Sequence, residues 1–102
     1  MSGRSSPVAL SRRAQRDIRL ILARTRQEWG EEQEARYAEA LRRALLTLSD
    51  FPERGRAREE LGPGYRSLVV ERHIIFYQPL PSRVFVIRIL SGRMNARRAL
   101  DG

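Results

Sequence analysis

Apolar residues recur at helical spacing through the first half of the chain. The first stripe contains Ala14, Ile18, Ile21, Leu22, Thr25 and Trp29. Ser11 stands before it as a candidate N-cap, and Gly30 follows as a terminator. The second stripe, preceded by acids suited to a helix start, contains Tyr37, Ala38, Leu41, Leu45 and Leu48. The pattern predicts an antiparallel helical hairpin over residues 12–49, with Trp29 and Tyr37 in the core.

The second half of the chain has the short period of β-strands. Strands are predicted over residues 65–71, 74–78 and 84–90, with short turns near Arg72 and at "PLPS". Residues 7–10 form a further short strand candidate. Residues 50–64 contain two prolines and three glycines and are expected to form a long surface loop. One helical turn is expected after Asn95.

These elements predict an α+β domain. A short N-terminal strand precedes an antiparallel helical hairpin, which packs on one face of a three-stranded antiparallel sheet, and the other face stays open. In the last strand, Phe85, Ile87 and Ile89 are expected on one face. Arg88 is expected to point from the other face, flanked by aliphatic neighbours.

Length and charge narrow the possible functions. A chain of 102 residues fits a single domain, 1–102. Its net charge is +8, and all 20 basic residues are arginines. Residues 65–100 contain seven arginines against the single acid Glu71. This concentration of positive charge favours an anionic partner, either a nucleic acid or an acidic protein segment.

Several classes of protein do not fit the composition. There is no cysteine and only one histidine, so neither a His/Cys metal site nor a cofactor is expected. No apolar run approaches the roughly 20 residues that a bilayer span needs. The N-terminus lacks the apolar segment of a secretion signal, so we expect a cytoplasmic protein with no membrane partner.

Two long segments, "FPERGRAREELGPGYRSLVVERHIIFYQ" and "VFVIRILSGRMNARRAL", carry a family resemblance. Together with the preceding strand and hairpin, they resemble the ParE branch of the RelE/ParE toxin superfamily, from about Val8 to Leu100. The most specific part is Gly64 to Ser67 followed by Arg72-His73. One departure is Ser91-Gly92, where many relatives have His-Gly.

The resemblance implies a toxin that is neutralised by a ParD-like antitoxin, whose acidic C-terminal segment wraps around it. A hetero-oligomer, a heterotetramer or larger, is expected. The resemblance also implies that the toxin poisons DNA gyrase without binding DNA directly. The RelE branch instead cuts messenger RNA on the ribosome, and this remains the enzymatic alternative. A basic nucleic-acid-binding module without toxicity is the third possibility.

The nuclease alternative makes a chemical demand that the sequence meets poorly. Cleavage through the ribose 2′-hydroxyl needs an activating group, a stabiliser of the phosphate and help for the leaving oxygen. Where the nuclease branch has an arginine and a tyrosine, this chain has Ile74 and Ala99. Only Arg93 matches. His73 with Glu71 could act as a base, but a solvated turn histidine is the favoured reading, and no catalytic residue is assigned.

The candidate binding residues form two sets. The predicted antitoxin-binding residues are Arg66, Leu68, Arg72 and Arg88. The predicted target-binding residues are Arg93, Met94, Arg97 and Arg98. Local pairing of the strand arginines with Glu59, Glu60 or Glu71 is the alternative for the first set. For the second, Leu100 could fold back onto the helices. A solvated helix face is expected at Arg12, Arg13, Arg42 and Arg43.

Overall fold

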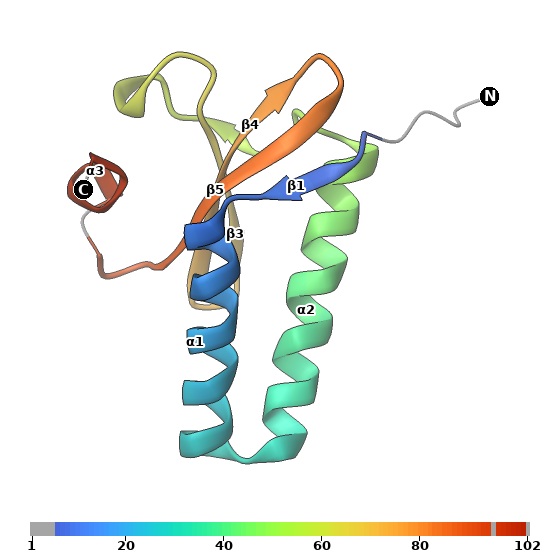
Figure 1. The fold of residues 1–102 in the computed structure, drawn as a ribbon, viewed down its shortest axis with the longest axis vertical. Coiled ribbons are helices and arrows are strands. Elements are labelled where there is room, and N and C mark those ends of the chain that lie inside the picture. Colours follow the sequence, from blue (N-terminus) through green and yellow to red (C-terminus); the bar gives the residue numbers. More distant parts are fainter. Residues whose placement is uncertain (1–5, 95, 102) are drawn as a thin grey trace.

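The computed structural model describes residues 6–94 and 96–101, and its largest feature is a helical hairpin (Figure 1). Helix α1 spans Arg12–Trp29 and helix α2 spans Glu31–Asp50. The Ser11 side chain accepts a hydrogen bond from the Ala14 N–H at 2.9 Å, which confirms the predicted N-cap. Gly30 joins the helices at φ 93°, a conformation that favours glycine.

A five-stranded sheet in the order β1-β5-β4-β3-β2 packs beside the hairpin. The strands are β1 Val8–Leu10, β2 Arg56–Ala57, β3 Arg66–Val70, β4 His73–Leu80 and β5 Arg83–Ser91. Strands β3, β4 and β5 form the predicted antiparallel meander. β1 adds to β5 in parallel, and β2 adds to β3. The α+β prediction is confirmed. Residues 50–64 contain more regular secondary structure than the predicted loop, since they include β2 and the 3₁₀ helix Glu59–Leu61.

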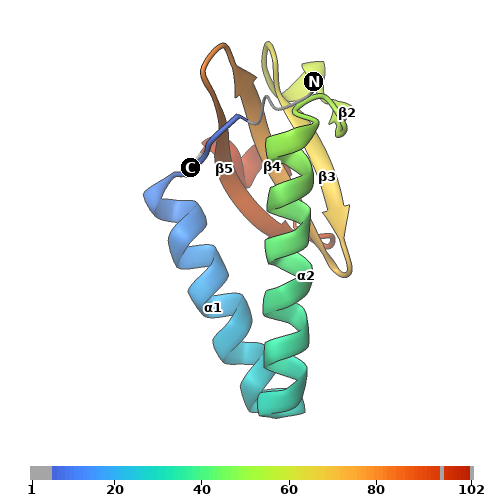
Figure 2. The same cartoon turned by 90° about the vertical axis from the view of Figure 1, so that its right-hand side faces the viewer.

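The hydrophobic core lies between the hairpin and the sheet, and Figure 2 shows α2 crossing in front of the strands. Its buried residues are Ala14, Tyr37, Leu41, Leu48, Val70, Ile75, Tyr77, Val84, Val86 and Ile89. The prediction for Tyr37 is confirmed. The prediction for Trp29 is wrong, since its side chain is 61% exposed. The reason is that α1 ends where the hairpin projects beyond the sheet (Figure 1).

A bulge in the sheet changes which face the β5 side chains occupy. Phe76 pairs with Arg88, but Tyr77 pairs with Val86, so Ile87 is the extra residue. The strict alternation predicted for this strand is therefore wrong. Ile89 packs in the core with Val86, while Arg88 lies opposite Phe76 on the face away from the hairpin.

The face away from the hairpin is partly covered, which contradicts the expected open face. Helix α3, Ala96–Asp101, lies on the opposite side of the sheet from α2 (Figures 1 and 2) and contacts β5. On this face Phe76 and Leu90 are only 1% and 2% exposed. The Arg58 guanidinium lies over the Phe76 ring at 5.5 Å. The helical turn predicted after Asn95 is confirmed, and it packs against the sheet. No helix in the ranges given above is both long and apolar enough to cross a bilayer.

Candidate protein interaction surfaces

Arg88, predicted to bind the antitoxin, forms an ion pair inside the chain. Its Nε and Nη2 atoms donate to the two carboxylate oxygens of Asp17 in α1, at 2.8 and 3.0 Å. Its Nη1 donates to the Ala99 carbonyl at 3.2 Å. The bond to Asp17 raises the pKa of Arg88. The alternative of pairing with Glu59, Glu60 or Glu71 is wrong for Arg88. Its guanidinium has little capacity left for an antitoxin carboxylate.

Two more residues of the predicted antitoxin set also have structural contacts. Arg66 donates from Nη1 to the Gly55 carbonyl at 2.7 Å and to the Glu53 carbonyl at 3.3 Å. These bonds tie the segment before β2 to the sheet. Leu68 is half-buried and packs against the core cluster. Both residues therefore stabilise the fold, and any contact with a partner would be additional.

Arg72 is the most accessible member of this set, because it lies in the turn between β3 and β4. Its guanidinium stands 5.9 Å from the centre of the exposed Trp29 ring. This contact connects the end of α1 to the end of the sheet. It also leaves an aromatic ring and a cation on the surface, a combination that is frequent in protein interfaces.

The only histidine is not the solvated turn residue that was expected. His73 is half-buried, and its Nδ1 lies 2.5 Å from the Tyr37 hydroxyl. The same hydroxyl donates to the Val70 carbonyl at 3.2 Å. Burial, followed by the positive charges of Arg24 and Arg72, lowers the pKa of His73. The Nδ1 atom is thus engaged within the fold.

The predicted target-binding residues divide into two pairs. Arg93 and Met94 are exposed between β5 and α3, and Met94 is 51% exposed. Arg97 and Arg98 are exposed as well, but Arg97 Nη2 donates to the Glu60 carbonyl at 2.6 Å. That bond holds α3 near the 3₁₀ helix. The tail combines an accessible segment with an anchored one.

Arg58 is a structural residue that the sequence analysis missed. Its side chain is 19% exposed, forms an ion pair with Glu60 at 2.7 Å and donates to Ser67 Oγ at 3.1 Å. The spacing of Arg58 and Glu60 is the only sequence signal for this role. By contrast, Arg42 and Arg43 are exposed as predicted. Their bonds to Glu39 lower its pKa to about 2.

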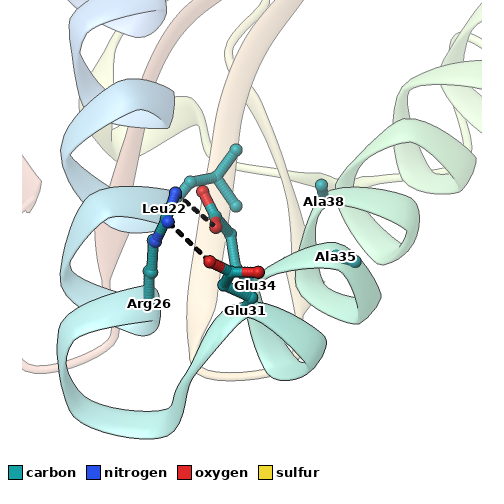
Figure 3. Close-up of a pocket in the computed structure, with 6 residues that line it drawn as sticks. All are labelled: Leu22, Arg26, Glu31, Glu34, Ala35 and Ala38. Carbon is teal, nitrogen blue, oxygen red and sulfur yellow. Dashed lines mark hydrogen bonds and ion pairs between the residues drawn. The ribbon is translucent and has the colours of Figure 1, made fainter.

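A groove between the two long helices was also missed. It has a volume of about 370 Å³, and Figure 3 shows α1 and α2 contributing opposite walls. Its apolar lining is Leu22, Ala35 and Ala38. Arg26 spans the hairpin end, 2.7 Å from Glu31 and 3.9 Å from Glu34 (Figure 3). Alanines at this spacing are typical of ordinary helix positions, so the groove could not be predicted from the residue pattern.

The surfaces described above consist of arginines, the groove between α1 and α2, and one engaged histidine. Across the parts of the chain that the structure describes, no three His, Cys, Asp or Glu side chains gather as a metal site would require. The accessible features on that part of the chain are exposed arginines and apolar side chains.

Comparison with known proteins gives this arrangement a family. Residues 8–96 match the family described as the ParE toxin of the type II toxin-antitoxin system, parDE. Toxin ParE1 of Caulobacter vibrioides is 39% identical over 94 residues, which is 92% of this chain and 97% of that protein. Toxin ParE1 of Mycobacterium tuberculosis is 35% identical over 97 residues, covering 94% and 99% of the two chains.

A solved structure has the same fold. The chromosomal ParDE TA system from P. aeruginosa contains a chain that matches with a TM-score of 0.73 at 18% identity, covering 87% of this chain and 98% of that one. The molecule is thus the toxin component of a type II toxin-antitoxin system. Within that class, the chain belongs to the ParE toxin family.

Proposed function

We propose that a ParD-like antitoxin inhibits this toxin by laying an acidic, amphipathic segment along the outer surface of the helical hairpin. The groove between α1 and α2 is the observation that carries this proposal, since it offers an apolar lining beside charged side chains. Exposed Leu46 adds apolar surface on α2. Helix α3 covers part of the sheet face away from the hairpin, so the hairpin is the better docking surface.

The charge of the toxin suits such a partner. Its net charge of +8 would attract an acidic segment over several ångströms and accelerate the encounter. Complex formation should therefore slow as salt increases. The mixed character of the groove, with apolar side chains below an Arg–Glu rim, would then fix the register of the segment. A heterotetramer or a larger complex is the assembly we expect.

The target that we propose is DNA gyrase, bound through Arg93 and Met94, and not messenger RNA. Ile74 and Ala99, which stand where the nuclease branch has functional groups, have aliphatic side chains and cannot transfer a proton. The Ala99 carbonyl also accepts bonds from Arg13 and Arg88. His73 is engaged by Tyr37. The toxin would therefore act by binding.

One observation keeps the nuclease as a second candidate. The Gly92 N–H donates to the Arg72 carbonyl at 3.1 Å, and Ser91 pairs with His73 across the strands. Arg93 therefore leaves the sheet close to the only histidine. A phosphate held by Arg93 would lie near a base candidate, although the group that helps the leaving oxygen has no evident source.

Inducing the toxin in a bacterium, with and without its antitoxin, separates the two candidates. Gyrase poisoning predicts growth arrest, altered plasmid supercoiling and DNA breaks, all suppressed by the antitoxin. Messenger RNA cleaved at codon positions, with plasmid topology unchanged, would replace the gyrase proposal by the nuclease. If induced cells grew normally at confirmed expression, both targets would be refuted for this chain.

A further inference from the structure

A second hollow lies on the other side of α1, where this helix meets β5. It has a volume of about 290 Å³ and is lined by Arg13, Arg16, Asp17, Leu20 and Arg88. Three guanidinium groups and one carboxylate therefore surround it. We call it the α1–β5 pocket. None of its residues lines the groove between the two helices.

The one carboxylate of the α1–β5 pocket is already used. Both oxygens of Asp17 accept bonds from Arg88, and Oδ2 also accepts the Ile89 N–H at 2.9 Å. Arg16 has no hydrogen bond or ion pair to any residue within 6–94 or 96–101. Arg13 has a 3.3 Å bond to the Ala99 carbonyl. Two guanidinium groups at this pocket thus lack a negative partner in that part of the chain.

The charge of the whole helix adds to this local excess. The basic residues of α1 are Arg12, Arg13, Arg16, Arg19, Arg24 and Arg26, and its acids are Asp17 and Glu28. In α2 the balance is reversed, since acids outnumber arginines there. Taken together, the charges of the two helices nearly cancel. Separately, α1 presents a positive field around the pocket.

The shape and lining of the pocket indicate the chemistry of its occupant. Guanidinium groups bind carboxylates through paired N–H···O bonds. The exposed Leu20 side chain supplies an apolar wall beside them. A nucleic acid backbone would call for a continuous basic groove and would gain little from a leucine. An acidic residue followed by an apolar one satisfies both parts of the site.

We propose that the α1–β5 pocket binds a Glu or Asp side chain of the antitoxin between Arg13 and Arg16, with a neighbouring apolar side chain against Leu20. This inference rests on the proposed function, because it names a second anchoring point for the same acidic segment. The carboxylate would neutralise the two arginines that Asp17 leaves unpaired. The carboxylate would bond to Arg13, which also donates to the Ala99 carbonyl in α3. The bound side chain would therefore lie next to the tail.

The test compares Arg16→Ala with Arg24→Ala, a matched loss of one exposed α1 arginine outside the pocket. The probes are the cognate antitoxin and a labelled seven-residue peptide of alternating Glu and Leu, with a Gln-for-Glu peptide and a short DNA duplex as controls. We expect Arg16→Ala to weaken both the antitoxin and the Glu peptide about fivefold to tenfold. Arg24→Ala should change them less than about twofold. Arg16→Lys should restore part of the loss, and the Gln peptide should not bind.

The outcomes separate the pocket from the proposed function. If the wild type fails to bind the antitoxin, the proposed function fails and the pocket proposal fails with it. If the wild type binds the antitoxin and both alanine variants bind equally well, the function stands and the pocket is refuted. Equal losses of affinity in the two variants would show only a general electrostatic effect of the positively charged α1, and would also refute the pocket. Stronger binding of the DNA duplex than of the Glu peptide, lost in Arg16→Ala, would make it a phosphate site.

Discussion

Asp17 accepts three hydrogen bonds at the edge of the sheet, two from Arg88 and one from the Ile89 N–H. Strand β1 ends at Leu10, so β5 has no strand partner beyond Val86 on this side. Side chains of the segment after β1 bond to β5 instead. Ser11 Oγ donates to the Ile87 carbonyl at 2.7 Å, and Asp17 accepts the Ile89 N–H. The hairpin thereby closes an edge that would otherwise be open to other chains.

We predict that Asp17→Ala destabilises the toxin by about 3 kcal/mol, the scale of breaking a largely buried ion pair. The two side chains are only 14% and 11% exposed, so Arg88 would be left with a charge in a poorly hydrated place. Urea unfolding measures the change in the free energy of unfolding.

The double variant Asp17→Ala/Arg88→Met is the control for this prediction. Removing both charges takes away the unpaired guanidinium, so the double variant should lose less than the sum of the single losses. A loss below about 0.5 kcal/mol in Asp17→Ala would contradict the structural role that we assign to the pair.

Tyr77 carries a second testable contact, in the core. Its hydroxyl donates to the Pro52 carbonyl and accepts the Gly55 N–H, both at 2.8 Å, and the residue is 0% exposed. Tyr77→Phe should therefore cost about 1–3 kcal/mol, because two backbone groups lose their partner. Thermal and urea unfolding measure it. Tyr65→Phe, whose hydroxyl has no bond within the described chain, is the control, and equal losses would contradict the prediction.

The lowered pKa of His73 predicts a pH dependence of stability. Its folded pKa lies below its ordinary value, so between the two values the unfolded chain binds more protons than the folded chain. The stability that neutral His73 contributes is present above about pH 6.5 and is lost as the pH falls toward the folded pKa. The free energy of unfolding should decrease from pH 7.5 to pH 5.5.

The variant His73→Asn tests the source of this effect. Asparagine preserves a polar partner for the Tyr37 hydroxyl but does not titrate, so the decrease should largely disappear. An unchanged pH profile in His73→Asn would assign the dependence to other groups.

Local patterns predicted the elements because each helix and strand carries its own signal. Ser11 and Gly30 mark helix ends through local hydrogen bonding and φ, so their sequence neighbours are enough to predict both. The Ile87 bulge was missed because it depends on the pairing of β5 with β4. The parallel β1–β5 pair was missed for the same reason: it joins segments far apart in the chain.

The binding residues were harder to predict than the fold. Arg88 looked unpaired in a strand whose sequence neighbours are apolar, yet its partner Asp17 lies 71 residues away. Trp29 fitted the apolar stripe of α1, but the hairpin extends past the sheet that would have buried it. Residue type and spacing identify candidates for charge and burial. Only the packing of distant segments decides which arginines have partners.

The final prediction concerns Arg93 and Met94, where the chain passes from β5 to α3. Both side chains are exposed, whereas Arg97 is held by the Glu60 carbonyl, so Arg93→Ala/Met94→Ala is a cleaner probe than removal of all the tail arginines. We expect this variant to lose growth arrest while its free energy of unfolding changes by no more than about 0.5 kcal/mol. Antitoxin affinity should be nearly unchanged, because the hairpin is intact. Arg19→Ala, an exposed arginine of α1, should remain toxic. Growth arrest, urea unfolding and antitoxin binding measured on both variants decide the matter: a fully toxic double variant removes this segment from the mechanism, and an unfolded one shows that the two side chains serve the fold.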